Sequence, residues 1–383
     1  MQSSSTIKYV GVFDRNIDLF EGQYKVPDGI SYNSYVITDE KIAIMDSVDI
    51  GFTNEWLSNI KNTIGDREPD YLVVQHMEPD HSASIIHFTR AYPNTKIVAS
   101  QKAFAMMKSF FGTDFPEKQI IVKDGDKLSL GKRDLTFIGA PMVHWPEVVM
   151  TYDPLEKALF SADAFGKFGA RELDDGWVNE ARRYYIGIVG KYGAQVQALL
   201  KKASALEIKS IYSLHGPVLN ENIPYYINLY SLWSSYTPEE DGILIAYTSI
   251  YKNTEAAARM LYEILIKNGK KAEIRDLARC DMHEAVALAF KYSTLTLASP
   301  TYNADVFPFM KEFIDHLTER NFSNRKVALI ENGSWAPMAA KVMRVMLDSS
   351  KNLTFTETTV TIKSALSEES KARIIDLANE LCA

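Results

Sequence analysis

Four side chains that often bind metal ions stand close together in this sequence: His76, Glu78, Asp80 and His81. They directly follow the apolar run of residues 71–74, which predicts a short strand that ends at this motif. Structural zinc sites favour cysteine thiolates, whereas a mixture of imidazole and carboxylate ligands suits iron or manganese. The motif therefore predicts a metal site at the end of a strand, with iron or manganese favoured over zinc.

Three more residues of metal-ligand type also follow short apolar runs: His144, Asp163 and His215. In layered α/β folds, the loops that leave the strand ends meet at one edge and can gather residues that are distant in the sequence. Together with the first motif, these residues are enough to hold two ions. If Asp163 bridges the ions, we expect the other ligands to divide into two sets: His76, Glu78 and His144 on one ion, and Asp80, His81 and His215 on the other.

The charge of this ligand set supports a pair of divalent ions. Three carboxylates and a bridging hydroxide carry four negative charges, so the pair could be buried without a large uncompensated charge. Taken singly, each histidine is more often an ordinary hydrogen-bonded residue, and Asp163 alone could cap a helix. The shared position at strand ends favours the metal reading. Trp145, Tyr184 and Tyr185 are candidate neighbours of the ligands, with ordinary packing as the alternative.

The first half of the chain alternates short β-rich runs with helical stretches. The predicted strands are residues 34–38, 41–45, 71–75, 96–99, 120–122, 135–138, 148–152 and 158–160. Several are joined by polar turns of hairpin length. The pattern predicts two mixed sheets with helices outside them, an α/β sandwich.

The pattern changes after residues 237–242, whose proline and acidic residues predict a linker. Five alternations of strand and helix follow, with strands expected at residues 243–247, 271–276, 294–298, 326–330 and 355–361. This is the layout of a small doubly wound parallel sheet. We therefore expect two domains, residues 1–238 and 239–383.

Three loops of the second domain are suited to a planar nucleotide. The first follows a strand, is rich in hydroxyl groups and runs into a helix, so its backbone N–H groups and the helix N-terminus favour a phosphate. A plain helix N-cap at Asn253 or Thr254 is the alternative. The glycine-rich dinucleotide fingerprint is absent, which favours a mononucleotide. The expected binding residues are Thr248, Ser249, Ile250, Tyr251, Lys252, Asn253 and Thr254 in the first loop, Ser299, Pro300, Thr301, Tyr302 and Asn303 in the second, and Asn332, Gly333, Ser334 and Trp335 in the third.

Length, charge and cysteine content narrow the class of protein. A chain of 383 residues is long enough for two domains, and its formal charge of −7 gives no basic surface for nucleic acid or anionic lipid. No basic and apolar leader begins the sequence, so a cytoplasmic protein is expected. Only Cys280 and Cys382 occur, so one chain cannot build a four-thiolate iron centre.

These motifs, in this order, resemble those of the flavodiiron proteins. The resemblance rests on His76-x-Glu78-x-Asp80-His81 followed by His144, Asp163 and His215, in a sandwich domain that precedes a flavodoxin-like one, and it covers essentially the whole chain. It implies a metallo-β-lactamase-like first domain. Hydrolases of that fold normally carry histidine where this chain has Glu78, whereas the family resembled here has glutamate at that position and iron in its site. His81 is the least secure ligand.

The resemblance also implies an activity, cofactors and partners. The expected activity is the reduction of dioxygen to water or of nitric oxide to nitrous oxide at two non-haem irons per chain, with FMN as the second cofactor. Electrons are expected from an external donor such as rubredoxin or a flavin reductase, because this chain has neither four clustered thiols nor a nicotinamide fingerprint; the resemblance is thus to a member without a fused rubredoxin domain. A head-to-tail homodimer, or a dimer of such dimers, in an anaerobe is implied. Lys252 and residues 331–335 depart from the family's more glycine-rich loops, which bears on flavin potential or partner choice.

Two other classes of protein remain open at this point. One is a dinuclear zinc hydrolase of the same fold with a flavodoxin-like appendage, against which Glu78 argues. The other is a non-catalytic electron-transfer flavoprotein, against which the complete ligand set argues. The sequence does not distinguish dioxygen from nitric oxide as the substrate, and it does not identify the electron donor.

Overall fold

The structure is a computed structural model that describes residues 6–169 and 176–383. The chain forms two compact units, one of Met1–Tyr185 and Ala194–Ser231, the other of Ile186–Gly193 and Leu232–Ala383. The domain boundary expected between residues 238 and 239 stays a prediction. Within the described residues, no helix is both long and apolar enough to span a bilayer.

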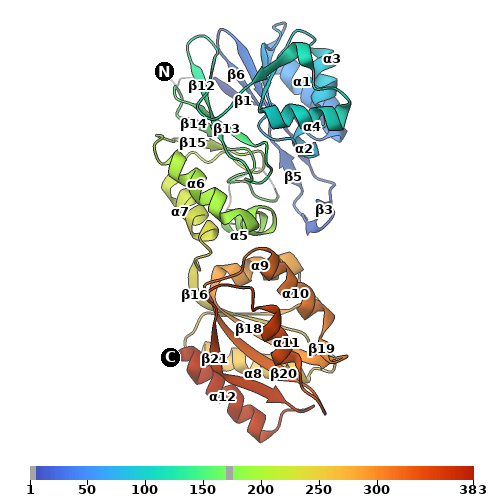
Figure 1. Ribbon diagram of the computed structural model, residues 1–383, viewed down its shortest axis with the longest axis vertical. Coiled ribbons are helices and arrows are strands. Elements are labelled where there is room, and N and C mark those ends of the chain that lie inside the picture. Colours follow the sequence, from blue (N-terminus) through green and yellow to red (C-terminus); the bar gives the residue numbers. More distant parts are fainter. Residues whose placement is uncertain (1–5, 170–175) are drawn as a thin grey trace. The chain divides into compact units, whose positions relative to one another are not determined.

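The first unit is built on two mixed sheets (Figure 1). One sheet has the order β1 (Ile7–Tyr9), β6 (Tyr35–Thr38), β7 (Ile42–Met45), β8 (Tyr71–Val73), β9 (Lys96–Ala99) and β10 (Gln119–Ile121). The other has the order β11 (Lys127–Ser129), β12 (Asp134–Gly139), β13 (Val149–Asp153), β14 (Ala158–Phe160) and β15 (Ser210–Tyr212). Parallel and antiparallel pairs occur in both sheets.

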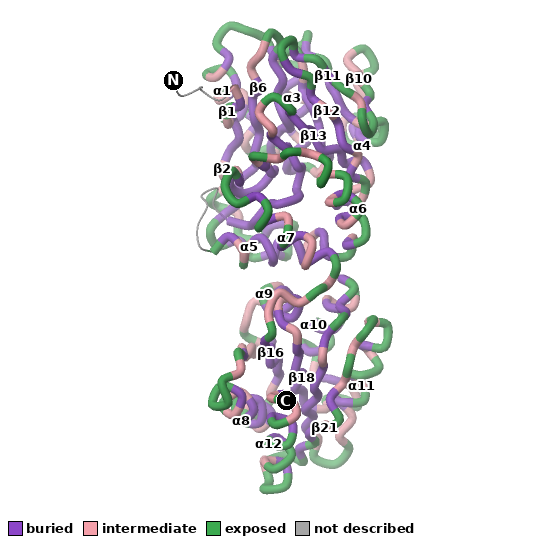
Figure 2. Tube along the Cα trace, turned by 90° about the vertical axis from the view of Figure 1, so that its left-hand side faces the viewer, coloured by how far each residue is buried: buried purple, intermediate pink, exposed green. Residues whose placement is uncertain are grey.

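Buried apolar side chains from both sheets meet in one core. Ile37 and Val73 come from the first sheet, and Leu135, Phe137 and Phe160 from the second. The helices of this unit are α1 (Thr53–Ile64), α2 (Pro79–Ser82), α3 (Ile85–Ala91), α4 (Gln101–Phe111), α5 (Trp177–Tyr184), α6 (Gly193–Ala203) and α7 (Ile223–Ser234). Figure 2 shows that burial is concentrated in the strands, while the loops and outer helix surfaces are exposed. The predicted α/β sandwich is confirmed.

Several short strands of the first unit were not predicted. Besides β1 and β11, they are β2 (Val12–Asp14), β3 (Leu19–Phe20), β4 (Tyr24–Lys25) and β5 (Ile30–Tyr32), which pair as β2 with β5 and β3 with β4. Segments of two or three residues carry too little periodic pattern to separate them reliably from loops. They are strands only because a partner lies opposite, as Ile37 lies opposite Ile7.

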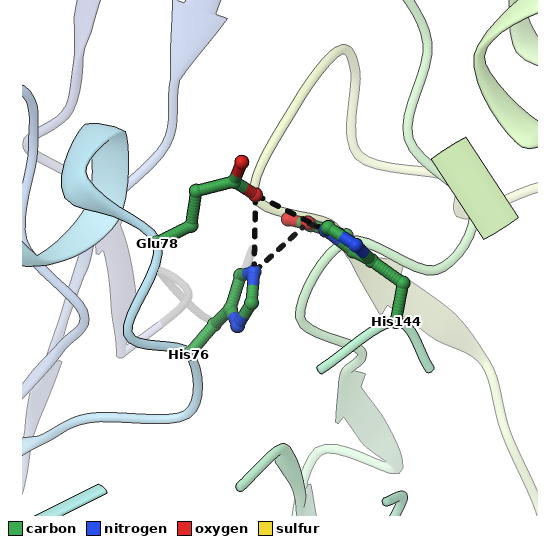
Figure 3. Close-up of side chains that lie close together, drawn as sticks. His76, Glu78 and His144 are labelled. Carbon is green, nitrogen blue, oxygen red and sulfur yellow. Dashed lines mark hydrogen bonds and ion pairs between the residues drawn. The ribbon is translucent and has the colours of Figure 1, made fainter. Parts of the chain in front are cut away.

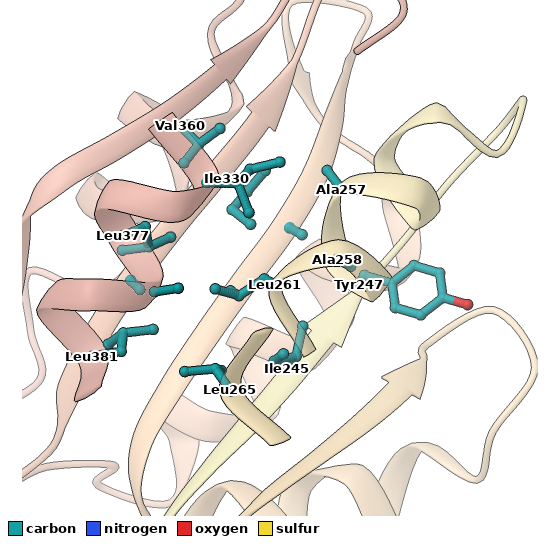
Figure 4. Packing of buried hydrophobic residues seen from close by; sticks show 14 of the residues in the cluster. Ile245, Tyr247, Ala257, Ala258, Leu261, Leu265, Ile330, Val360, Leu377 and Leu381 are labelled. Atoms are coloured by element: carbon teal, nitrogen blue, oxygen red, sulfur yellow. The ribbon is translucent and has the colours of Figure 1, made fainter. Parts of the chain in front are cut away.

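The second unit is the predicted doubly wound sheet. Its order is β17 (Ala272–Asp276), β16 (Glu240–Tyr247), β18 (Tyr292–Tyr302), β20 (Lys326–Asn332) and β21 (Thr354–Ile362), all parallel, with β19 (Asp305–Val306) antiparallel to the end of β18. The helices are α8 (Asn253–Lys267), α9 (Met282–Lys291), α10 (Pro308–Glu319), α11 (Ala339–Met346) and α12 (Glu368–Cys382). On one face, Leu261 of α8 and Leu377 of α12 pack against Ile245, Ile330 and Val360 of the sheet (Figure 4).

Two strands of this unit are longer than the sequence indicated. β16 begins at Glu240, inside the expected linker, because Glu240 pairs with Tyr292 ahead of a bulge. β18 continues to Tyr302 instead of ending near residue 298, because Ser299 and Pro300 pair with β20 and the last two residues pair with β19. The polar composition of these ends conceals the pairing, since it is typical of loops.

Candidate metal centre and nucleotide pocket

The seven predicted metal ligands come from loops that leave strands at a common edge. β12 and β14 are both antiparallel to β13, and β15 is parallel to β14, so β12, β14 and β15 run in the same direction. His144, Asp163 and His215 follow the carboxyl ends of these three strands. In the other sheet, the segment after β8 carries His76 and Glu78, and α2 then presents Asp80 and His81.

One group of four residues could hold a metal ion: His76, Glu78, His144 and Asp163. In Figure 3 the side chains of His76, Glu78 and His144 point toward one another. Glu78 Oε2 lies 3.3 Å from His76 Nε2 and 3.1 Å from His144 Nε2. Asp163 Oδ2 lies 3.3 Å and 3.1 Å from the same two nitrogens.

A second group consists of Asp80, His81 and His215, all of them buried. Asp80 Oδ2 lies 3.1 Å from His81 Nε2 and 3.4 Å from His215 Nε2. The remaining oxygen of Asp163, Oδ1, lies 3.4 Å from His81 Nε2 and 3.9 Å from His215 Nε2. The two oxygens of Asp163 therefore face different groups, which is the division expected for a bridging carboxylate.

The second group carries a feature that suits a cation. The Nε2 atoms of His81 and His215 face each other at 3.0 Å, and the ring of His215 donates through Nδ1 to the carbonyl oxygen of Ser31, so the lone pair of its Nε2 is directed into this group. Metal–nitrogen bonds of about 2.1 Å at roughly a right angle would leave two donors about 3.0 Å apart. In addition, Asp80 Oδ1 and Asp163 Oδ1 are buried and have no hydrogen-bond partner among the residues that the structure describes. The donor atoms fit a bound pair of metal ions.

The close packing of imidazoles and carboxylates shifts their pKa values. Burial lowers the pKa of His81 and of His144, but the carboxylates around each ring outweigh it and raise the pKa of His81 to about 10 and that of His144 to about 9. Burial raises the pKa of Glu78 and Asp163, but the surrounding histidines outweigh it and hold both below their ordinary values. The pKa of His215 is lowered by burial and by His81.

Three supporting residues were not predicted from the sequence. Glu147 Oε1 accepts hydrogen bonds from His76 Nδ1 at 2.9 Å and from the backbone N–H of Met77 at 2.8 Å. His215 Nδ1 lies 2.7 Å from the carbonyl oxygen of Ser31, so this ring donates there through Nδ1. Such partners fix the ring orientation of a metal-binding histidine. Only Glu147 had a sequence signal, because it is a carboxylate in the same loop as His144.

Glu21, at the turn between β3 and β4, is the third residue. Glu21 is exposed as a whole residue, but partial desolvation of its carboxyl and the adjacent carboxylate of Glu78 raise the pKa of Glu21 to about 7. Of the predicted aromatic neighbours, Trp145 lies against His76 with 5.3 Å between ring centroids, and Tyr184 lies 5.4 Å from the ring of His215. Tyr185 instead packs against Tyr230, at 5.0 Å.

The three predicted loops of the second unit surround a pocket of about 600 Å³. The pocket lies beside the ends of β16 and β18, where the order of the strands reverses and doubly wound sheets bind their ligands. The predicted residues that line it are Ser249, Ile250, Tyr251, Asn253, Thr254, Pro300, Thr301, Tyr302, Asn303, Asn332, Gly333, Ser334 and Trp335, and Ala304, Ala336, Met338 and Ser364 join them.

Three predicted residues do not line this pocket. Thr248 is buried and donates a hydrogen bond to Ser299 Oγ at 3.2 Å, and Ser299 accepts another from the backbone N–H of Phe307. These two hydroxyls therefore join the first and second loops. Lys252 is exposed, with a left-handed φ of 66°, and directly precedes α8.

The donors and ring surfaces of the pocket fit a flavin mononucleotide. Among residues 6–169 and 176–383, Ser249 Oγ is shielded from solvent without a hydrogen-bond partner, and no side chain caps the N-terminus of α8. Both features suit a phosphate group. Trp335 is 92% exposed and Tyr302 43% exposed, so each offers an uncovered aromatic face to a planar ring.

Comparison with known proteins identifies the family. Residues 30–216 match the family model described as "ODP family beta lactamase". A "Nitric oxide reductase" of Moorella thermoacetica is 29% identical over 98% of this chain and 96% of that protein. An "Anaerobic nitric oxide reductase flavorubredoxin" of Vibrio vulnificus is 30% identical over 86% of this chain and 69% of that protein.

Solved structures agree with this assignment. The flavodiiron protein from Giardia intestinalis has a TM-score of 0.91 at 27% identity and covers 100% of this chain and 96% of its own. The rubredoxin oxygen:oxidoreductase of Desulfovibrio gigas also has a TM-score of 0.91, at 24% identity over 100% of this chain and 97% of that one, which shows the shared fold. This chain belongs to the flavodiiron protein family.

Proposed function

We propose that this protein is an oxidoreductase that reduces nitric oxide to nitrous oxide, dioxygen to water, or both. The observation that carries the proposal is the position of Asp163, whose two carboxylate oxygens face two separate groups of ligand residues. The relatives named as nitric oxide reductases and the structural neighbour named as a rubredoxin oxygen:oxidoreductase support the same reaction class.

In this proposal the seven ligands hold two non-haem irons, and the pocket of the second unit holds FMN. When bound, the irons and the flavin supply the electrons and the coordination positions that a diatomic gas needs for reduction. The protein contributes geometry. Glu147 and the carbonyl oxygen of Ser31 orient the rings of His76 and His215, and all four histidine ligands keep Nε2 within 3.9 Å of an oxygen of Asp163.

The nucleotide pocket has its own division of roles in this proposal. Ser249 and the N-terminus of α8 would hold the phosphate, and Tyr302 and Trp335 would contact the flavin ring. Thr301 Oγ accepts hydrogen bonds from the backbone N–H groups of Met338 and Ala339, at 2.9 and 3.2 Å, and so ties the loop before α11 to the end of β18. The carbonyl and hydroxyl groups of these loops would then set the position of the ring.

Partners, assembly and location are further parts of the proposal. A rubredoxin or a flavin reductase would supply electrons, and the chain would act in the cytoplasm of an anaerobe as a head-to-tail homodimer or as a dimer of such dimers. The candidate metal centre and the nucleotide pocket belong to different units of the chain. An active monomer in light scattering coupled to gel filtration would contradict the dimer.

The experiment that tests the function begins with metal analysis of protein purified from its native host without added metal. Two irons and one FMN per chain are expected, whereas full occupancy by zinc together with hydrolase activity would favour a hydrolase. Anaerobic stopped-flow mixing of the reduced protein with each gas should show rapid reoxidation of the flavin. If neither gas is consumed, the chain acts as a non-catalytic electron carrier.

A matched pair of variants sharpens this test. Asp163→Asn removes the charge at the proposed bridging position, and we expect it to abolish gas reduction. Asp66→Asn removes an exposed carboxylate that pairs only with Lys61 among the residues described here, and we expect it to leave the rates unchanged. Equal activity of the two variants would contradict the role of Asp163.

A further inference from the structure

A second cavity lies on the outer face of the sheet that carries His144, Asp163 and His215. It has a volume of about 60 Å³ and lies between that sheet and helices α6 and α7. Leu159 of β14 lines it, while its neighbours Ala158 and Phe160 belong to the core between the two sheets. The cavity is therefore separate from that core and from both candidate cofactor sites.

The lining is almost entirely apolar, and its few polar groups already have partners. The hydroxyl of Ser204 donates to the carbonyl oxygen of Lys201 at 2.8 Å. The hydroxyl of Tyr230 accepts from the backbone N–H of Phe165 at 2.5 Å, and the carbonyl oxygen of Ala164 accepts from Ser161 Oγ at 2.6 Å. A buried water needs two to four polar partners, whereas apolar cavities stay dry and bind apolar guests such as xenon. The chemistry of this cavity therefore disfavours water and suits a small neutral apolar molecule.

The position of the cavity relates it to the metal centre. Ala164 and Phe165 line it and directly follow Asp163 in the sequence. The rings of Phe165 and Tyr230 are stacked at 4.1 Å, and the hydroxyl of Tyr230 accepts the hydrogen bond from the backbone N–H of Phe165, two residues after Asp163. Ser204 also lines the cavity and is exposed to solvent. The lining thus extends from the surface to the residues beside the proposed bridging carboxylate.

We propose that this cavity binds the diatomic gas substrate and holds it beside the diiron centre, with the stacked pair of Phe165 and Tyr230 at its inner end. The inference rests on the proposed function. Nitric oxide and dioxygen are neutral, weakly polar molecules that prefer an apolar environment to water, and the cavity offers them that environment on the way to Asp163. Loss of the cavity should then raise the KM for the gas and leave kcat unchanged, because the metal ligands are untouched.

The test uses a variant that fills the cavity and a matched variant on the same helix. Ala203→Leu adds a branched side chain to the lining, whereas Ala198→Leu adds the same atoms at an exposed position of α6 that does not line the cavity. Crystals of the holoprotein are pressurised with xenon, whose anomalous scattering reports occupancy without any catalysis. The wild type and Ala198→Leu are expected to bind xenon in the cavity, and Ala203→Leu is expected to bind none.

The kinetic measurement is the KM for each gas under the same conditions. We expect Ala203→Leu to raise it by roughly threefold or more with kcat unchanged, and Ala198→Leu to leave both constants as in the wild type. If Ala203→Leu folds poorly, Ile227→Phe fills the cavity from α7 and takes its place. A wild-type crystal without xenon in the cavity, or a filled cavity with unchanged KM, overturns the proposal. Failure of the proposed function is distinguishable, because a wild type that reduces neither gas would still bind xenon.

Discussion

Glu147 offers a sharp test of how the metal centre is supported. Its Oε1 atom accepts two hydrogen bonds, from His76 Nδ1 at 2.9 Å and from the backbone N–H of Met77 at 2.8 Å, and all three groups are buried. The change Glu147→Gln keeps the shape and both acceptor contacts but removes the negative charge. We expect it to weaken iron binding at the group formed by His76, Glu78 and His144, and to leave the other group intact.

The magnitude follows from the contacts. Loss of an outer partner of a metal-binding histidine lowers metal affinity by about 10–100-fold. We expect a value near the lower end, about 10-fold or 1.4 kcal/mol, because glutamine retains the hydrogen bonds. Glu147→Ala leaves two buried donors without a partner, at about 1–3 kcal/mol each, so it should also lower the free energy of unfolding by about 2–6 kcal/mol.

The assay is an anaerobic titration of metal-free protein with ferrous ion against a chelator of known affinity, fitted to two sites. Anomalous diffraction at the iron edge then assigns the loss to one group. Glu117→Gln, at an exposed carboxylate, is the control. The carbonyl oxygen of Ser31 supports His215 independently of Glu147, so an equal loss of iron from both groups in Glu147→Gln would refute the reasoning. Unchanged iron binding in this variant would refute it as well.

Three more predictions follow from pKa shifts, backbone strain and exposure. The pKa values of His81 and His144 are raised to about 10 and about 9, so both rings carry a proton in the metal-free protein and should release it when iron binds. The logarithm of the iron-binding constant should therefore rise by up to about two for each pH unit between pH 6 and 8, and the released protons can be measured in a pH-stat. The protonated rings of His81 and His144 should also stabilise the metal-free protein against unfolding, fully below pH 6.5, and this contribution should be lost as the pH rises through 9 to 10. A free energy of unfolding that does not change with pH would contradict the raised pKa values. Lys252→Gly should raise the free energy of unfolding of the apoprotein, measured in urea, by about 1 kcal/mol, because glycine adopts φ 66° without strain. The control is Lys270→Gly, at a position outside the left-handed region, which should not raise the free energy of unfolding. Trp335→Ala should weaken FMN binding at least about 10-fold in a flavin fluorescence titration, with base–aromatic stacking of about 1–3 kcal/mol as the lost term, and unchanged affinity would show that the exposed ring does not contact the flavin.

The clustering of the seven candidate ligands could be predicted because metal chemistry restricts residue type and because strand ends are visible as the ends of apolar runs. His76 and Glu78 follow β8, and Asp163 follows β14, as the runs indicate. The fold class could be predicted for the same reason, since the longer strands carry enough apolar residues to show. The contribution of Ser31 could not be predicted, because it acts through its carbonyl oxygen, which every residue possesses.

Glu21 was missed for a different physical reason. Its carboxyl reaches Glu78 only because β3 and β4, of two residues each, form a hairpin, and strands that short carry no periodic signal. In the nucleotide pocket of the second unit, too, the sequence did not show which residues face the ligand. Thr248 and Ser299 have the residue types of phosphate ligands, but their hydroxyls are engaged with each other in the folded chain. Residue type identifies a capable group, and only the tertiary contacts decide whether it faces the ligand or a neighbour.

The backbone around Asp163 shows that the fold favours the geometry of the site over local stability. Ala162 and Phe165 both adopt left-handed φ values, 50° and 68°, which cost non-glycine residues about 1–2 kcal/mol each. The loop is held in this conformation by the hydrogen bond from Ser161 Oγ to the carbonyl oxygen of Ala164 and by the one from the backbone N–H of Phe165 to Tyr230. Strain that the surrounding contacts maintain is typical of functional positions. A helix-capping role for Asp163 would need no such strain, whereas the proposed bridging role, in which its two oxygens face separate groups of ligands, gives a reason for the surrounding contacts to maintain it.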